Sequence, residues 1–258
     1  MIEEPYRWVE AIANRGEYIE TQLAAGSPIA AVGYRDGILL LTLGRSRQKL
    51  FEIYDRIAMG AIGHPGDIER LRMAAIELAS TEGFTRAAAD VSLRRLAHYS
   101  LSPVMKTAFE QVYGAPFLAR MLFAEVGVTQ DTDLFLRIDY DGAIETNGAT
   151  FAETRQDFGA LSSTRPSTEL METFLRAEHS ADATFERALK VALDAWTVGH
   201  LALGDAGVKE LPARDKLVAE RKERMRAGGV EAVVLDRDDK TAIRYRSLTD
   251  AELKAAVM

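Results

Sequence analysis

The sequence predicts an α+β fold in which two antiparallel sheets form a sandwich with helices on both outer faces, a four-layer αββα arrangement. Three observations predict it. Four short apolar strands in two hairpins fill the stretch from Ser27 to Asp67, segments of helical period stand before and after it, and further strands lie near residues 120–146 and 231–246. At 258 residues the chain fits one sizeable domain, residues 1–258.

The first predicted element is a helix over Pro5–Ala25. Proline suits the first turn of a helix, and Gly26 stands where a helix of this length ends. Gly16 weakens the middle, because glycine is a poor helix former. A loose apolar stripe gives the helix one face to bury, and it consists of Val9, Ile12, Ala13, Ile19 and Leu23.

The four strands come next. Ile29–Tyr34 and Ile38–Leu43 are joined by Arg-Asp-Gly, and Asp-Gly is the strongest short hairpin signal. The second of them is almost wholly apolar, as expected of a strand buried on both faces. Lys49–Ile53 and Ile57–Ile62 repeat the arrangement around Tyr-Asp-Arg. A His-Pro-Gly-Asp segment then stops the last strand, and we expect Asp67 to cap the helix that follows.

Two helices should form one outer layer. The first, Asp67–Glu82, is closed by Gly83 and carries Ile68, Leu71, Ala75, Leu78 and Ala79 at helical spacing. Asp90 is expected to cap the second helix, and Pro103 to bend or interrupt it. The residues of the second helix expected to face inward are Leu93, Leu96, Ala97, Val104, Met105, Ala108 and Val112.

The same periodicities predict the rest of the chain. The elements are strands at Arg120–Val126, Leu134–Ile138 and Ala143–Thr146 and around Phe151, helices at Ser167–Ala177 and Asp182–Leu201, a hairpin of Glu231–Asp236 with Thr241–Arg246, and a short helix at Thr249–Val257. Residues 204–229 are less regular. Pro212–Ala227 fits a solvated charged helix or an insertion, because Lys and Arg mixed with Glu surround a weak apolar stripe.

The composition is that of an ordinary globular chain, with 47% hydrophobic and 28% charged residues. The net charge of -7 argues against nucleic acid as a partner, because phosphate binding needs a basic face. The sequence lacks cysteine and its four histidines lie in unrelated segments, so we expect no metal site and no cofactor. The acidic start differs from a signal peptide, and no apolar run reaches membrane-spanning length, which predicts a cytoplasmic protein without a membrane partner.

One stretch carries a family resemblance. A hairpin, the strand Lys-Leu-Phe-Glu-Ile-Tyr-Asp-Arg, an Ala-x-Gly turn and an acidic helix start follow one another in an order that resembles proteasome core-particle subunits. These belong to the N-terminal-nucleophile hydrolase superfamily, and the resemblance is in particular to the α-type subunit of bacterial proteasomes. It extends from about Trp8 to the C-terminus and thins at residues 204–229.

The resemblance implies a non-catalytic structural and gating subunit in protein degradation. Identical copies are then expected to pack head-to-tail into a closed ring of seven, which stacks on catalytic β-type subunits and docks an ATPase unfoldase ring. The helix over residues 7–25 packs against neighbouring subunits in such a ring. Residues 1–6 become the segment that gates the axial pore, and they are Met1, Ile2, Glu3, Glu4, Pro5 and Tyr6.

An enzyme is the alternative. In β-type subunits a threonine at the mature N-terminus attacks, with its own amine as base. Ser27 stands where that threonine would be, and Lys49 where the active-site lysine lies, which leaves open a self-processed N-terminal-nucleophile hydrolase. Pro28 departs from the β-type pattern, and Leu43 replaces the acidic residue, so Lys49 is expected to lack a carboxylate partner. The predicted helix before Ser27 also leaves it an amide nitrogen. A third alternative is a homo-oligomeric relative with another binding role.

Lys49 has a second interpretation within the family. In α-type subunits a lysine in this context faces a pocket between neighbouring subunits and receives the C-terminal carboxylate of an activator. Gly63 matches the glycine whose backbone lines that pocket. The family often has a basic residue at the position of Glu20, so its replacement puts the affinity of the pocket in question. The simpler alternative is a surface lysine at the start of a strand.

Overall fold

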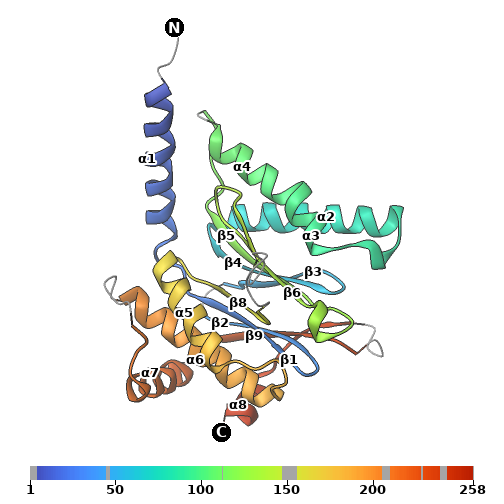
Figure 1. Ribbon diagram of the computed structural model, residues 1–258, viewed down its shortest axis with the longest axis vertical. Coiled ribbons are helices and arrows are strands. Elements are labelled where there is room, and N and C mark those ends of the chain that lie inside the picture. The colour runs from blue at the N-terminus through green and yellow to red at the C-terminus, as the bar shows by residue number, and fades with distance from the viewer. Residues whose placement is uncertain are drawn as a thin grey trace.

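The computed structural model describes residues 5–44, 47–111, 113–146, 156–204, 210–227, 229–238 and 243–257. In this part of the chain, two five-stranded antiparallel sheets pack face to face, and helices cover the outer face of each (Figure 1). The predicted four-layer sandwich is therefore confirmed.

The first sheet has the strand order β10-β9-β2-β1-β8. Its strands are β1 (Ile29–Tyr34), β2 (Gly37–Leu43), β8 (Phe158–Leu161), β9 (Val230–Asp236) and β10 (Tyr245–Ser247). As the apolar run predicted, β2 is buried on both faces. Leu39 and Leu41 belong to the core shared with the outer helices, and Ile38 and Leu40 to the core between the sheets. The strand predicted around Phe151 falls outside the described residues.

The second sheet has the order β3-β4-β5-β6-β7. Its strands are β3 (Leu50–Tyr54), β4 (Ile57–Gly63), β5 (Ala119–Glu125), β6 (Leu134–Ile138) and β7 (Ile144–Thr146). Leu122 and Phe135 face the first sheet across the core, while Met59 and Phe123 face the helices that cover the second sheet. The predicted strands of this sheet are confirmed to within a residue or two at each end.

Helix α2 (Pro65–Thr85) lies over the second sheet, and both of its predicted ends are wrong. His64 caps its start, with Nδ1 accepting from the Gly66 amide at 3.2 Å. The Asp67 carboxylate is used elsewhere, because it accepts from the Leu118 amide at 3.0 Å. Gly83 lies inside the helix, where a Cβ would stand 2.1 Å from the Tyr54 hydroxyl oxygen. The glycine therefore permits close packing and does not end the helix.

The second helical segment consists of a 3-10 turn (Ala88–Asp90), α3 (Leu93–Leu96), a π turn (Ala97–Leu101) and α4 (Ser102–Glu110). Ser92, not Asp90, caps it, since the Ser92 hydroxyl accepts from the Arg95 amide. As expected, the regular α-helix is interrupted next to Pro103, because a π turn just before the proline accommodates the missing amide. Met105 is buried as expected, whereas Val104 is exposed. The predicted inward position of residue 112 lies outside the described residues.

The other outer layer consists of α5 (Arg165–Glu178), α6 (Phe185–Gly204), α7 (Arg214–Ala227) and α8 (Asp250–Val257). The predicted helix α7 is present, but it is packed and not wholly solvated. Leu217 is buried against Val198 and Ala202 of α6, and Arg221 pairs with Asp194 of α6 at 2.5 Å.

Helix α1 (Pro5–Leu23) confirms the predicted N-terminal helix and projects away from the sandwich (Figure 1). Near its base Ile19 and Leu23 are fully buried. Farther out, the Arg15 guanidinium donates to the carbonyl oxygens of Ala108 at 3.2 Å and Phe109 at 2.9 Å, at the end of α4. Within the described residues, no helix combines the length and apolar character that a membrane crossing requires.

Candidate functional site

Lys49 and Gly63 line one cavity, of about 560 Å³. It lies where the end of α1, the strands β3 and β4 and the start of α2 meet. Its wall also includes Leu23, Gly26, Arg47, Phe51, Ile62 and Glu69. The two residues selected from the sequence are thus brought together, in a cavity with a largely apolar wall and a few charged side chains.

Gly63 gives the cavity wall its shape. Its φ of +143° is a conformation that side chains rarely adopt, and a Cβ would stand 2.0 Å from the Leu118 carbonyl oxygen. The next residue, His64, donates its amide to that same carbonyl at 2.7 Å. The chain therefore turns from β4 directly into the cap of α2, with only backbone at this point of the wall.

Lys49 stands just before β3, and its side chain is partly buried. Its carbonyl oxygen accepts from the Ala61 amide at 3.0 Å, which holds it against β4. Burial lowers the pKa of Lys49, and the nearby charge of Glu231 raises it. No hydrogen bond or ion pair with another described residue engages the ammonium. Its donors therefore remain available to a ligand.

Glu231 is a neighbour of Lys49 that the sequence did not reveal. Its carboxylate accepts from the Lys49 amide at 3.0 and 3.1 Å and from the Leu50 amide at 2.9 Å. As expected, the Lys49 ammonium forms no ion pair with a carboxylate of the described residues, although β9 brings the charge of Glu231 close to it. Burial raises the pKa of Glu231, while the hydrogen bonds from the Leu50 and Lys49 backbone amides and the charge of Lys49 lower it. No local pattern could have found this contact between residues 182 positions apart.

The charges around the cavity favour an anion. Arg47 and Lys49 both line it, whereas its carboxylate, Glu69, is already bound by Arg72 at 2.7 and 2.8 Å. Pro65, in the first turn of α2, also lines the wall, so the positive end of that helix is close by. A ligand with a carboxylate and apolar neighbouring groups fits this combination of wall and charge.

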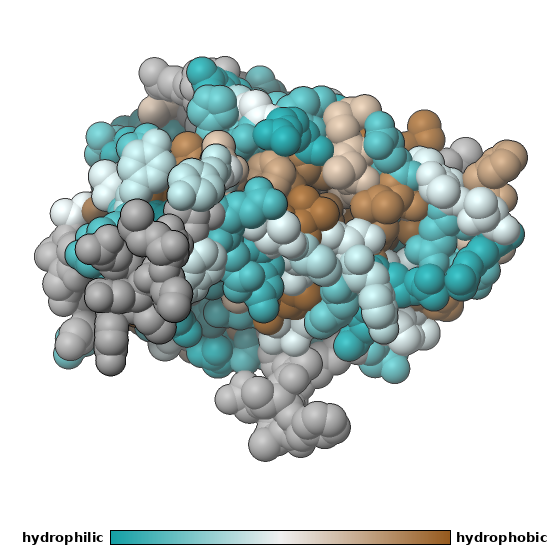
Figure 2. Space-filling model, turned by 90° about the horizontal axis from the view of Figure 1, so that it is seen from above, coloured by the Kyte–Doolittle hydropathy of each residue, from teal (hydrophilic) through white to brown (hydrophobic). Residues whose placement is uncertain are grey.

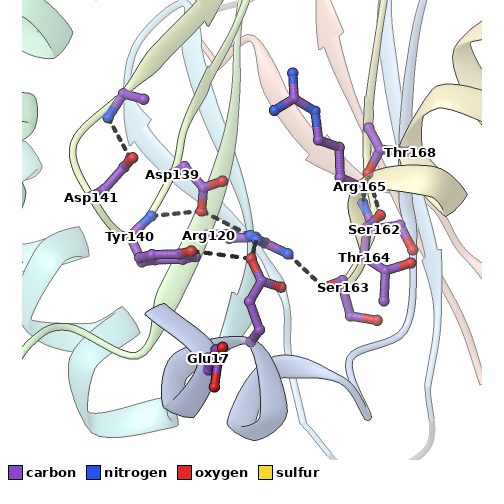
Figure 3. A network of polar contacts seen from close by, with 12 residues as sticks. Glu17, Arg120, Asp139, Tyr140, Asp141, Ser162, Ser163, Thr164, Arg165 and Thr168 are labelled. Atoms are coloured by element: carbon purple, nitrogen blue, oxygen red, sulfur yellow. Dashed lines mark hydrogen bonds and ion pairs between the residues drawn. The ribbon is translucent and has the colours of Figure 1, made fainter. Parts of the chain in front are cut away.

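Glu20 does not line this cavity. Its carboxylate is bound by Arg120, and the Tyr140 hydroxyl donates to it at 3.2 Å. Arg120 is buried and also pairs with Asp139 at 2.8 Å and donates to the Ser163 carbonyl oxygen (Figure 3). Within one protomer Glu20 therefore belongs to a network that ties α1 to the sandwich. Its effect on the affinity of the cavity stays a prediction.

Ser27 is held in a different place. Its hydroxyl donates to the Leu43 carbonyl oxygen at 2.6 Å and accepts from the Trp196 indole nitrogen at 3.1 Å. It lines a second cavity with Trp196 and His200, whose rings stack at 4.9 Å. Lys49 does not line that second cavity. The two residues of the enzyme alternative thus do not share a cavity, and α1 precedes Ser27 in the same chain.

The predicted gate segment is only partly described. Residues 1–4 lie outside the described residues, and Pro5 and Tyr6 begin α1.

Comparison with known proteins found similar chains among actinobacterial proteins, although no family model matched. One is the proteasome subunit alpha of Parafrankia sp. (strain EAN1pec), 30% identical over 219 residues, which covers 81% of this chain and 83% of that one. The proteasome subunit alpha of Streptomyces griseus is 31% identical over 212 residues, which covers 81% and 73%. That of Streptomyces avermitilis is 27% identical over 246 residues, which covers 95% and 85%.

Proposed function

The chain belongs to the family of proteasome α subunits. From this premise we propose that it is a non-catalytic structural subunit of a proteasome core particle in the cytoplasm, which gates the pore and docks an activator. Identical copies form a closed ring of seven, and this ring stacks on a ring of catalytic β-type subunits. The opposite face of the ring holds the pore and docks an ATPase unfoldase. Residues 1–6 gate that pore.

The exposed side chains of helix α1 support the proposal of a ring. Trp8, Val9 and Tyr18 on this helix are exposed, although they are large and apolar or aromatic. Seen from above, the molecule also shows hydrophobic side chains gathered near the middle of its surface, with hydrophilic ones around them (Figure 2). Exposed apolar surface of this kind is typical of contacts with other subunits.

The bonds of Ser27 support the non-catalytic role. Its hydroxyl already donates to one partner and accepts from another, and its nitrogen is part of a peptide bond to Gly26. A terminal amine is the base that a nucleophile of this superfamily needs. The intact mass of the purified chain tests this role, since loss of the first 26 residues would favour the hydrolase. Peptide cleavage by the chain alone, lost in Ser27→Ala, would overturn the proposal.

The cavity shared by Lys49 and Gly63 is the observation that carries the docking role. Its two cationic side chains, its neutralised carboxylate and its apolar wall suit the C-terminal carboxylate of a chain from the ATPase ring. Lys49→Met removes the ammonium and keeps much of the apolar stem. We expect this variant to assemble with the cognate β-type subunit, as seen by electron microscopy, but to lose stimulation of protein degradation by the ATPase.

The matched control is Lys222→Met, which removes an exposed lysine on α7. We expect it to keep full stimulation. Equal stimulation of the Lys49→Met and control particles would contradict docking at this cavity. The gate is tested separately by deleting residues 1–6, which should raise hydrolysis of short peptides by the unassisted core particle.

A further inference from the structure

We propose that Glu231 is a positioning residue of the Lys49 cavity, which fixes the backbone at the start of β3 and places a negative charge behind the ammonium that receives the incoming carboxylate. This inference rests on the proposed docking function. It assigns to a residue on the other sheet a part in preparing the site.

The first step is the backbone geometry. β3 is an edge strand of its sheet, so the amides along its outer side have no neighbouring strand to pair with. The Glu231 carboxylate accepts from the outward amide of Leu50, the first residue of β3, and from the amide of Lys49 just before the strand. The Tyr245 hydroxyl of β10 adds a bond to the Leu50 carbonyl oxygen at 3.1 Å. The backbone at the start of β3 is thus held by β10, the edge strand of the opposite sheet, and by its neighbour β9.

The Glu231 carboxylate binds the backbone of Lys49 and not its ammonium. Its oxygens are bound to amides, and it forms no ion pair with the Lys49 ammonium within the described part of the chain. A carboxylate bonded directly to the ammonium would compete with the ligand. Here the charge is near enough to favour the protonated lysine and yet leaves the donors of that lysine free.

The other charged residues around the cavity do not provide Lys49 with a free carboxylate. Arg47, just before it in the chain, adds positive charge, and α2 contributes Glu69 already paired with Arg72. α1 contributes Gln22 and Leu23, neither of which is charged. Glu231 on β9 is therefore the carboxylate of the described residues that offsets the desolvation of the lysine.

Glu231→Gln in the assembled α ring tests the inference, because glutamine keeps the shape and one acceptor oxygen but removes the charge. The first readout is the rate of Lys49 acetylation against pH, followed by mass spectrometry, since only the neutral amine reacts. We expect the profile to move to lower pH, as the pKa of Lys49 falls without the carboxylate. Glu52→Gln, an exposed carboxylate on β3, is the matched control and should leave the profile unchanged.

The second readout is the binding of a short peptide with apolar C-terminal residues, offered as the free acid and as the C-terminal amide. The wild-type ring should prefer the acid. In Glu231→Gln we expect the acid to bind about tenfold more weakly at alkaline pH, a difference of about 1.4 kcal/mol. Glu231→Asp retains the charge and should restore the acetylation profile, although its shorter side chain loses part of the acid affinity.

The outcomes separate this inference from the docking proposal. If the wild-type ring shows no preference for the acid, the docking function is wrong, whatever the acetylation profiles show. If the wild-type ring prefers the acid, and Glu231→Gln matches it in both acid preference and acetylation profile, the role of Glu231 is wrong. Should Glu231→Gln fail to assemble, Glu231→Asp decides: unchanged acid affinity in that variant would overturn the inference.

Discussion

Replacing Arg237 by methionine tests the ion pair that joins the two sheets at one end of the sandwich. Arg237 follows β9, and Asp133 precedes β6. The guanidinium binds both carboxylate oxygens, at 2.7 and 2.8 Å, and only 1% of the Asp133 side chain is exposed. Gly127 completes the cluster, because its amide donates to Asp133 and its carbonyl oxygen accepts from Arg237.

The expected cost follows from this burial. Among the described residues, Arg237→Met leaves the enclosed Asp133 carboxylate with only the Gly127 amide as a hydrogen-bond partner. Breaking a buried pair in this way costs about 3–5 kcal/mol. For a chain of this size that corresponds to a fall in melting temperature of roughly 6–20 °C. The matched control is Arg187→Met, which removes an exposed pair with Glu178 and should cost about 0–1 kcal/mol.

Thermal unfolding followed by circular dichroism measures both variants, at one protein concentration because assembly adds to the apparent stability. The double variant Asp133→Asn with Arg237→Met should recover much of the loss, since it no longer encloses an unpaired charge. Equal melting temperatures for Arg237→Met and Arg187→Met would refute the reasoning. So would a double variant that is less stable than Arg237→Met alone.

Three further predictions concern other parts of the chain. Glu20→Lys puts a second cation beside the buried arginine of its network, so hydrogen exchange in α1 should speed up, whereas Glu17→Lys at an exposed position should leave it unchanged. Burial lowers the pKa of His179 from its ordinary 6.5 to about 4. The neutral imidazole therefore makes its full contribution to the free energy of unfolding above about pH 6.5 and loses it as the pH falls towards 4. In His179→Gln the free energy of unfolding in urea should depend less on pH within that window, and an unchanged dependence on pH would count against this. Leu217→Ala removes the contacts of α7 with α6, so it should lower the free energy of unfolding by about 2–5 kcal/mol and speed proteolysis of α7. Lys216→Ala, at an exposed position, should do neither.

The parts of the fold that were predictable are those that neighbouring residues determine. The hairpin at Asp36 and Gly37 and the strands on either side of it follow from local pattern, and the two strands pair antiparallel around a turn of Arg35 and Asp36, with Tyr34 opposite Gly37. The start of α2 was misplaced because Asp67 looked like a cap, whereas its carboxylate binds Leu118, 51 residues away. A side chain that could serve two partners cannot be assigned from its neighbours alone.

In the candidate site, too, the family pattern predicted some residues, and contacts between residues far apart in the sequence could not be predicted. Lys49 and Gly63 were selected by resemblance to a family pattern, and the structure brings them to one cavity. Neither the resemblance nor the spacing indicated Glu231, which reaches Lys49 from the other sheet. The resemblance pointed to the position of Glu20, but its side chain does not line the cavity, and only the packed helix reveals that its partner is Arg120.

These contacts make the end of α1 a shared boundary. Glu20 fixes one side of it through the Arg120 network, while Leu23 and Gly26 form part of the Lys49 cavity on another side. Gly26 bonds to the Leu23 carbonyl oxygen at 2.9 Å, and a Cβ at Gly26 would stand 2.1 Å from Ile62, so this turn has little room to yield. The turn after α1 is therefore held from both sides by contacts within the protomer, because Arg120 anchors Glu20 just before it and the close approach of Ile62 confines Gly26 within it.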